Sequence, residues 1–210
     1  MTTERRAIRL GLTGPIGCGK STVASWIGER DDALVIDADR LARDVLAPGR
    51  PELDAVYARF GSALATPDGS LDRAALARIV FTDPDALRDL ERIVHPAVRM
   101  AIRDALAAAD AAGVRIVVVE AIKLVEGGLA DDCDAVWFVT CAGPTQLERL
   151  MARGTSEADA AARIATQGDI VGRAVSHATA VIETSGSLAA TRQAVEAALA
   201  DLLRMVSPTA

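Results

Sequence analysis

The chain has 210 residues, of which half are hydrophobic and a quarter charged, so it can bury a sizeable core in one α/β domain that carries an insert. Its net charge of −6 argues against general nucleic-acid binding, which needs a basic footprint. We expect no membrane partner, because the N-terminus lacks a signal-peptide core and no apolar run approaches spanning length. The three cysteines show no disulfide or metal spacing, which fits a reducing cytosol, so we expect a cytoplasmic protein.

The first predicted elements are a strand and a helix separated by a glycine-rich loop. Residues 8–12 form a short apolar run suited to a buried strand, and residues 23–27 fit the buried face of a helix. Between them, residues 11–22 read GLTGPIGCGKST, which contains the Gly-x-x-x-x-Gly-Lys-Ser pattern of a phosphate-binding loop, the P-loop. The alternative is a glycine turn that binds no ligand.

Each residue type in this loop suits a task in binding ATP. Glycines such as Gly14 and Gly19 let backbone N–H groups point at phosphate oxygens in conformations that a Cβ would forbid. Lys20 can reach the β- and γ-phosphates as a point charge, and the Ser21 hydroxyl can bind the accompanying Mg²⁺. The helix that follows adds a dipole favourable to an anion.

Two carboxylates follow the second predicted strand, residues 34–36. Asp37 and Asp39 would lie at the carboxyl edge of the sheet, where open α/β sheets bind their ligands. One of them could accept a proton from a substrate hydroxyl or help to hold Mg²⁺. The alternative is an ordinary helix N-cap, because Leu41 and Val45 continue at helical spacing.

Residues 48–111 are predicted to be almost entirely helical. Pro51 marks a helix start and Gly61 a helix stop, while Asp83 and Pro84 form an N-cap and first-turn pair. A long helix then runs to His95-Pro96, where proline should end or kink it. This is too much helix for a simple crossover, so we predict an inserted helical subdomain that covers a substrate.

The third strand, residues 115–119, ends at Glu120 and resembles the acidic motif that helps P-loop enzymes hold Mg²⁺. A fourth strand, residues 135–140, leads into a helix on which Arg149 and Arg153 lie four residues apart. Together with Arg163 and Arg173 they suit a lid over nucleotide phosphates; the alternative is a solvated helix face. A short strand near residues 180–182 and a helix over residues 188–205 complete the chain.

These segments together resemble the dephospho-coenzyme A kinase family. The resemblance covers about residues 8–200. The matching segments are GLTGPIGCGKST, VIDADRLAR (35–43), Pro48-Gly49, Phe60-Gly61, GSLDRAALARIVF (69–81), LERIVHP (90–96), Gln146-Leu147 with Arg149 and Arg153, and RIATQ (163–167).

The resemblance implies an α/β P-loop kinase with a parallel five-stranded sheet flanked by helices. Residues 1–210 would form a single kinase domain. Its nucleotide-binding core would comprise 8–47, 112–145 and 178–206, its helical coenzyme A subdomain 48–111, and its helical lid 146–177. The enzyme would use ATP with Mg²⁺ to phosphorylate the 3′-hydroxyl of the ribose of dephospho-coenzyme A, which is the last step of coenzyme A synthesis.

The resemblance also assigns roles by position. Residues 17–22 would grip ATP and Mg²⁺, Asp39 would be the base, and Arg149 and Arg153 would stabilise charge. The predicted catalytic residues are Lys20, Asp39 and Arg149. The predicted ATP-binding residues are Gly14, Gly17, Cys18, Gly19, Lys20, Ser21, Thr22, Arg149 and Arg153. The predicted metal ligands are Ser21, Asp39 and Glu120, and the acceptor substrate would meet Asp39, Arg43, His95 and Lys123.

Lys123 and Thr184 depart from the family pattern. The family usually has leucine at position 123 and asparagine, near the nucleotide base, at position 184. We hypothesise that Lys123 contacts a substrate phosphate; the alternative is a local ion pair with Glu120 or Glu126. Two other functions stay open, a P-loop kinase for a nucleoside or sugar and a non-catalytic nucleotide-binding regulator. The oligomeric state is left open as well.

Overall fold

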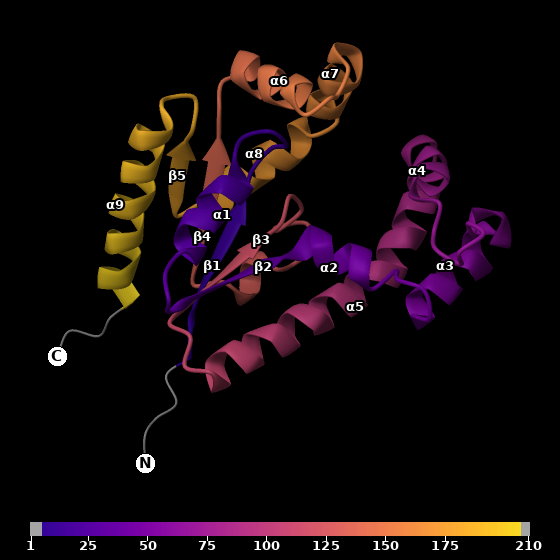
Figure 1. Ribbon diagram of the computed structural model, residues 1–210, viewed down its shortest axis with the longest axis horizontal. Helices are drawn as coiled ribbons and strands as arrows, with labels where there is room; N and C mark the ends of the chain where they lie inside the picture. The colour runs from indigo at the N-terminus through magenta and orange to yellow at the C-terminus, as the bar shows by residue number, and fades with distance from the viewer. Residues whose placement is uncertain (1–5, 207–210) are drawn as a thin grey trace. The chain divides into compact units, whose positions relative to one another are not determined.

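The computed structural model describes residues 6–206, without the side chains of residues 169–171. The chain divides into two compact units (Figure 1). The sheet unit comprises residues up to Asp37 and from Leu106 onward, and the helical unit comprises Ala38–Ala105. Among the described residues, no helix combines the length and apolarity needed to cross a membrane.

The sheet unit contains a parallel five-stranded sheet in the order β2-β3-β1-β4-β5. The expected α/β fold is therefore confirmed. The register sets Leu12 beside Glu120 and Asp37 beside Glu120, so β1, β2 and β3 end together at the carboxyl edge. The strands are β1 (Ile8–Thr13), β2 (Ala33–Asp37), β3 (Ile116–Glu120), β4 (Ala135–Thr140) and β5 (Ala180–Glu183).

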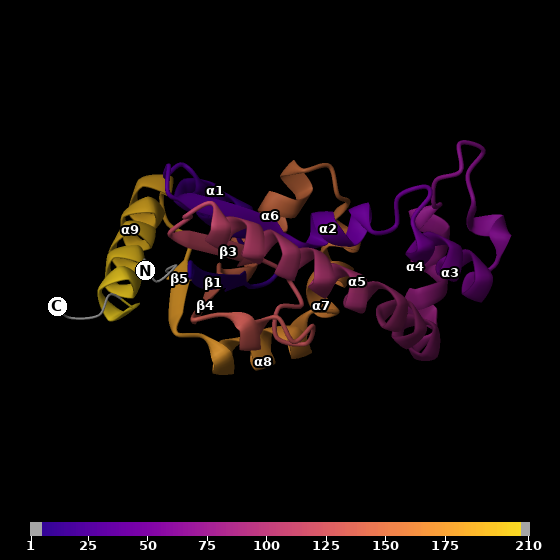
Figure 2. The same ribbon diagram turned by 90° about the horizontal axis from the view of Figure 1, so that it is seen from below.

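Helices cover both faces of this sheet. The buried cluster on one face joins Leu10 and Leu12 of β1 to Val23 and Ile27 of α1 and to Leu199 of α9, and Figure 2 shows α8 on the opposite side of the strands from α1. Because helices cover both faces of the sheet, both sides of the Ile-Val-Val-Val run of β3 are buried. This strand is therefore apolar throughout and has no polar face. The helices are α1 (Lys20–Gly28), α6 (Gly143–Ala152), α7 (Glu157–Ala165), α8 (Gly168–His177) and α9 (Leu188–Val206), with the 3₁₀ turn η2 (Ala130–Asp132).

The helical unit follows the local signals of its sequence. α3 begins at Pro51 and ends before Gly61, whose φ of 102° a side chain would resist. The carboxylate of Asp72 accepts the Ala75 N–H at 2.9 Å and caps α4, and Asp83 accepts the Asp85 N–H at 2.8 Å before α5. The elements are α2 (Ala38–Asp44), α3 (Pro51–Phe60), η1 (Ser62–Leu64), α4 (Arg73–Thr82) and α5 (Pro84–Ala111), whose last turns belong to the sheet unit.

An end or a kink of the long helix was predicted at Pro96, and the predicted end is wrong. α5 continues through Pro96 to Ala111. Proline removes one backbone hydrogen bond from the helix, but a buried stripe that includes Val94, Val98 and Ile102 spans the position at a spacing of four residues. Burial of this stripe outweighs the local cost of the proline.

Candidate functional site

The P-loop connects the end of β1 to the start of α1. At Gly14, with φ of 143°, an added Cβ would lie 2.0 Å from the carbonyl oxygen of Val139 in β4, so only glycine lets the two backbones approach this closely. Gly19 directly precedes α1 and has φ of 84°. The loop therefore has the backbone conformation that the sequence motif requires.

Lys20 and Ser21 open α1 beside the carboxyl edge of the sheet. The Lys20 side chain is buried, and its ammonium donates to the carbonyl oxygens of Gly14 at 2.9 Å and Pro15 at 3.2 Å. The Ser21 hydroxyl donates to Oε1 of Glu120, at the end of β3, at 2.8 Å. Two of the three predicted metal ligands thus lie together, and their hard oxygen atoms are the donors that Mg²⁺ prefers.

No group of three or more His, Cys, Asp or Glu side chains within the described part of the chain could hold a metal by itself. A pair of protein oxygens suits Mg²⁺ nonetheless, because this ion keeps several waters and takes other ligands from substrate phosphates.

Two glutamines hold the P-loop from neighbouring helices. Gln146 of α6, itself buried, donates to the carbonyl oxygen of Ile16 at 2.7 Å, and Oε1 of Gln167, which precedes α8, accepts the Ile16 N–H at 2.8 Å. Both glutamines belong to segments that match the family, and the resemblance assigned neither of them a role. Their only sequence signal is that resemblance, since each lies more than a hundred residues from the loop that it contacts.

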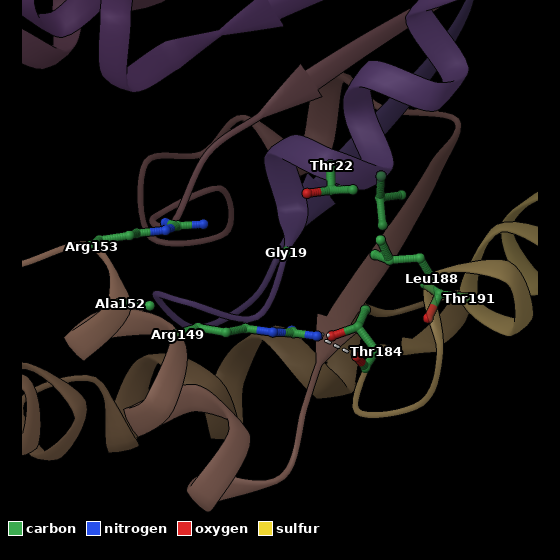
Figure 3. A pocket seen from close by; sticks show the side chains of 9 residues that line it. Gly19, Thr22, Arg149, Ala152, Arg153, Thr184, Leu188 and Thr191 are labelled. Carbon is green, nitrogen blue, oxygen red and sulfur yellow. Dashed lines mark hydrogen bonds between the residues drawn. The ribbon is translucent and has the colours of Figure 1, made fainter.

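A pocket of about 280 Å³ adjoins the end of the P-loop (Figure 3). Gly19 and Thr22 line it together with Arg149 and Arg153, so the pocket brings together four predicted ATP-binding residues. The Arg149 guanidinium donates to the Thr184 hydroxyl at 2.9 Å and to the Thr184 carbonyl oxygen at 2.6 Å. The remaining lining residues are Val23, Ala152, Thr184, Leu188 and Thr191.

Thr184, where the family usually has asparagine, is buried between the P-loop and the sheet. Its hydroxyl lies 2.9 Å from the carbonyl oxygen of Cys18 and 3.1 Å from that of Thr140, and can donate to either while it accepts from Arg149. A short hydroxyl side chain therefore links Arg149 to the backbone of the P-loop.

Cys18 of the P-loop is joined by a disulfide to Cys141, the residue after β4, with the two Cα atoms 5.2 Å apart. The expectation that the cysteines form no disulfide is wrong for this pair. The two residues are 123 positions apart, and only the parallel pairing of β1 with β4 brings them together. Cys133 is a free thiol, and burial, followed by the neighbouring Asp132 and Asp134 carboxylates, raises its pKa to about 12.

Lys123 lies in the turn after β3, where its carbonyl oxygen accepts the Gly127 N–H at 2.8 Å. The two acids that flank it in sequence each have a partner elsewhere. Glu120 accepts from Ser21, and Glu126 forms an ion pair with Arg173 of α8 at 3.5 Å. Arg173, one of the four predicted lid arginines, therefore contacts the turn that contains Lys123.

The helical unit holds the other predicted substrate residues. Asp39 and Arg43 are exposed on α2, and Asp39 is its second residue, inside the first turn rather than at the N-cap. His95, half-buried on α5, lines a pocket of about 340 Å³ with Arg92 and Arg99. The other residues of this pocket are Arg88, Glu91 and Pro96.

Known proteins match the chain over most of its length. The family model described as dephospho-CoA kinase matches residues 8–190. The dephospho-CoA kinase of Moorella thermoacetica is 46% identical over 197 residues, which cover 93% of this chain and 92% of that protein. A crystal structure of a Thermus thermophilus protein, TT1252, is similar with a TM-score of 0.78 and 34% identity, and covers 94% of this chain and 99% of its own.

The structure of the dephospho-CoA kinase from Campylobacter jejuni has a TM-score of 0.62 and 25% identity, and the match covers 94% of this chain and 98% of that one. Sequence and fold therefore point to one family across both units. The chain belongs to the dephospho-CoA kinase family.

Proposed function

We propose that this chain transfers the γ-phosphate of ATP to the 3′-hydroxyl of the ribose of dephospho-coenzyme A, which yields coenzyme A and ADP in the last step of coenzyme A synthesis. The observation that carries the proposal is the P-loop with Lys20 in place and the Ser21 hydroxyl on Glu120, beside a pocket that Arg149 and Arg153 line. We also propose that it acts in the cytoplasm, where ATP is available.

On the ATP side, the backbone N–H groups of residues 17–22 would bind the phosphates, as helix N-termini and glycine-rich loops do. Lys20 would leave the Gly14 and Pro15 carbonyls for the transferring phosphoryl group, whose negative charge it would stabilise. The pocket beside Gly19 and Thr22 would take the nucleoside, with Arg149 held against it by Thr184.

Ser21 and Glu120 would hold Mg²⁺, directly or through water, and Asp39 is proposed as a third ligand. Bound Mg²⁺ neutralises charge on the β- and γ-phosphates. Loss of the Ser21–Glu120 hydrogen bond would free both oxygens for this task.

On the acceptor side, Asp39 would orient the 3′-hydroxyl and accept its proton. Arg43, His95 and Lys123 would meet dephospho-coenzyme A, whose diphosphate suits the arginine-lined pocket of α5. We propose that residues 48–111 bind this substrate and that residues 146–177 close over ATP, which would exclude water from the reaction.

Mass spectrometry of an incubation with ATP, Mg²⁺ and dephospho-coenzyme A tests the proposal. We expect a gain of one phosphate on dephospho-coenzyme A and none on a panel of nucleosides and sugars. Phosphorylation of a panel compound in preference to dephospho-coenzyme A would favour the other kinase, and ATP binding without transfer to any acceptor would favour the regulator.

A further inference from the structure

The disulfide between Cys18 and Cys141 lies inside the nucleotide-binding machinery. Cys18 stands between Gly17 and Gly19, whose φ angles of 80° and 84° curve the loop, and its own side chain is fully buried. Its sulfur is bonded to that of Cys141, which is partly exposed. The bond therefore acts on the backbone that would bind phosphate, and Cys141 is the more exposed of its two residues.

The same bond fixes the base of α6. Cys141 lies two residues before α6, which places Gln146 on the Ile16 carbonyl and Arg149 on Thr184. Thr184 in turn contacts the Cys18 carbonyl oxygen. Apart from the disulfide, these contacts between the loop and α6 are hydrogen bonds. Hydrogen bonds can break and re-form as a ligand enters, whereas the disulfide cannot do so without a redox reaction.

We propose that Cys18 and Cys141 form a reversible redox switch, in which the disulfide fastens the P-loop to the base of α6 and slows the kinase. The inference rests on the proposed function through the assignment of residues 14–22 as the phosphate-binding loop. In many enzymes, the opening and closing of lids and loops over the substrate limits the turnover rate. A covalent cross-link between the loop and the segment that leads into α6, the helix that carries Arg149, restricts that motion.

The chemistry balances as two thiol–disulfide exchanges with a low-molecular-weight disulfide. The Cys141 thiolate attacks one sulfur of that disulfide and releases one small thiol. The Cys18 thiolate then attacks the Cys141 sulfur and releases the second, so two protons and two electrons pass to the small thiols. Only Cys141 has to meet the reagent, which is why a fully buried Cys18 can take part.

Cys133 supplies a matched control within the chain. Its sulfur lies 3.3 Å from the Leu129 carbonyl oxygen, to which it can donate, and burial with two neighbouring acids raises the pKa of its thiol to about 12. The reactive thiolate is therefore scarce at Cys133 near neutral pH. In the proposed cytoplasmic setting, most disulfides are transient and redox-sensing, as a switch of this kind requires.

The test equilibrates the full chain in glutathione buffers that range from fully reduced to fully oxidised. Acid quenching and alkylation, followed by peptide mass spectrometry, give the cross-linked fraction, and calorimetry gives the ATP affinity of each state. We expect phosphorylation of dephospho-coenzyme A to fall about tenfold as the cross-link forms, because gating slows, and to recover with dithiothreitol. The oxidised form should also melt several degrees higher, by about 5 °C or more.

Two variants distinguish a loss of activity caused by the cross-link from one caused by oxidation elsewhere in the chain. Cys133→Ser should respond to glutathione disulfide as the parent does, whereas Cys141→Ser, compared with itself under reducing conditions, should not respond. If Cys141→Ser folds poorly, comparison of the reduced and the cross-linked parent still tests whether the disulfide slows the kinase. The switch would be overturned by a full cross-link that leaves the phosphorylation rate and the ATP affinity unchanged. It would also be overturned if no cross-link formed in any buffer, or if Cys141→Ser lost as much activity on oxidation as the parent does. A reduced parent that binds ATP but phosphorylates nothing would overturn the proposed function, and the switch would then be judged by ATP affinity alone.

Discussion

Lys20 carries the charge on which phosphoryl transfer depends most directly in the proposed mechanism. Lys20→Met keeps most of the length of the side chain but removes the ammonium that now bridges the Gly14 and Pro15 carbonyls. We expect kcat to fall by about 10²-fold or more, because one preorganised charge at the transferring group is lost. Circular dichroism should show an intact fold, and full activity in this variant would contradict the nucleotide-binding assignment.

Asp39 is predicted to be the base. Asp39→Asn preserves its shape on α2 but removes the acceptor for the proton, so we expect kcat to fall by about 10²-fold. Affinity for dephospho-coenzyme A, measured by calorimetry, should change little. Asp44→Asn is the matched control, since Asp44 ends the same helix, is exposed, and pairs with Arg40 at 3.8 Å. Equal rates in both variants would show that Asp39 has no chemical role.

Lys123, the chain's other lysine, tests whether the turn after β3 meets a phosphate. We expect Lys123→Leu to raise the KM of dephospho-coenzyme A or ATP several-fold, while Lys123→Arg keeps the charge and retains most of the affinity. The effect should shrink as salt is added, because screening over a Debye length of about 10 Å at 0.1 M weakens charge contacts. Unchanged KM values at low ionic strength would leave only the local ion pair.

At the scale of elements, α6 and the P-loop depend on each other through Gln146. Gln146→Leu fills similar space but leaves the Ile16 carbonyl oxygen without its 2.7 Å donor. An unsatisfied buried acceptor costs about 1–3 kcal/mol, so we expect the urea midpoint to fall and the KM for ATP to rise. The same substitution at Gln193, exposed on α9, is the control and should change neither. Equal effects at the two positions would contradict the role of Gln146 in positioning the loop.

At the scale of the whole molecule, the two units should respond separately to pH. In the helical unit, Arg59 of α3 donates to Asp89 of α5 at 2.5 Å and Arg92 donates at 2.8 Å, and these contacts, Arg59 first, lower the pKa of Asp89 below its ordinary 3.8. The folded state therefore binds this proton more weakly than the unfolded state. The stabilisation is complete above the ordinary pKa and is lost as pH falls through the lowered pKa of the folded state.

We expect Asp89→Asn to reduce amide protection in residues 51–105 near neutral pH, with little change in the sheet unit. Hydrogen exchange, corrected for the intrinsic exchange rates at each pH, measures the amide protection of residues 51–105 and of the sheet unit. The difference between parent and variant should vanish at acidic pH, and Arg59→Leu should remove the same pH dependence. Fluorescence of Trp26 and Trp137, which both belong to the sheet unit, provides the control. Equal loss of protection in both units would contradict the prediction.

Features that depend on neighbours a few positions away could be predicted from the sequence. The P-loop between strand and helix, the start of α3 at Pro51, its end before Gly61 and the cap at Asp83 were all predicted and are all present. Each follows from local backbone preference or from a hydrogen bond within one turn. The apolar runs likewise predicted buried strands, and the family resemblance implied that they form a parallel sheet.

Contacts between distant residues could not be predicted from the sequence and are set by the packing of the folded chain. Sheet pairing places Glu120 on Ser21 and Cys141 on Cys18, and helix packing places Gln146 and Gln167 on Ile16. Burial of the α5 stripe likewise let the helix pass Pro96, against the local preference of proline. Such contacts join residues 99 or more positions apart in the sequence, or depend on a packed helix face. Residue spacing along the chain encodes neither, because strand order and helix packing fix these distances only after the chain has folded.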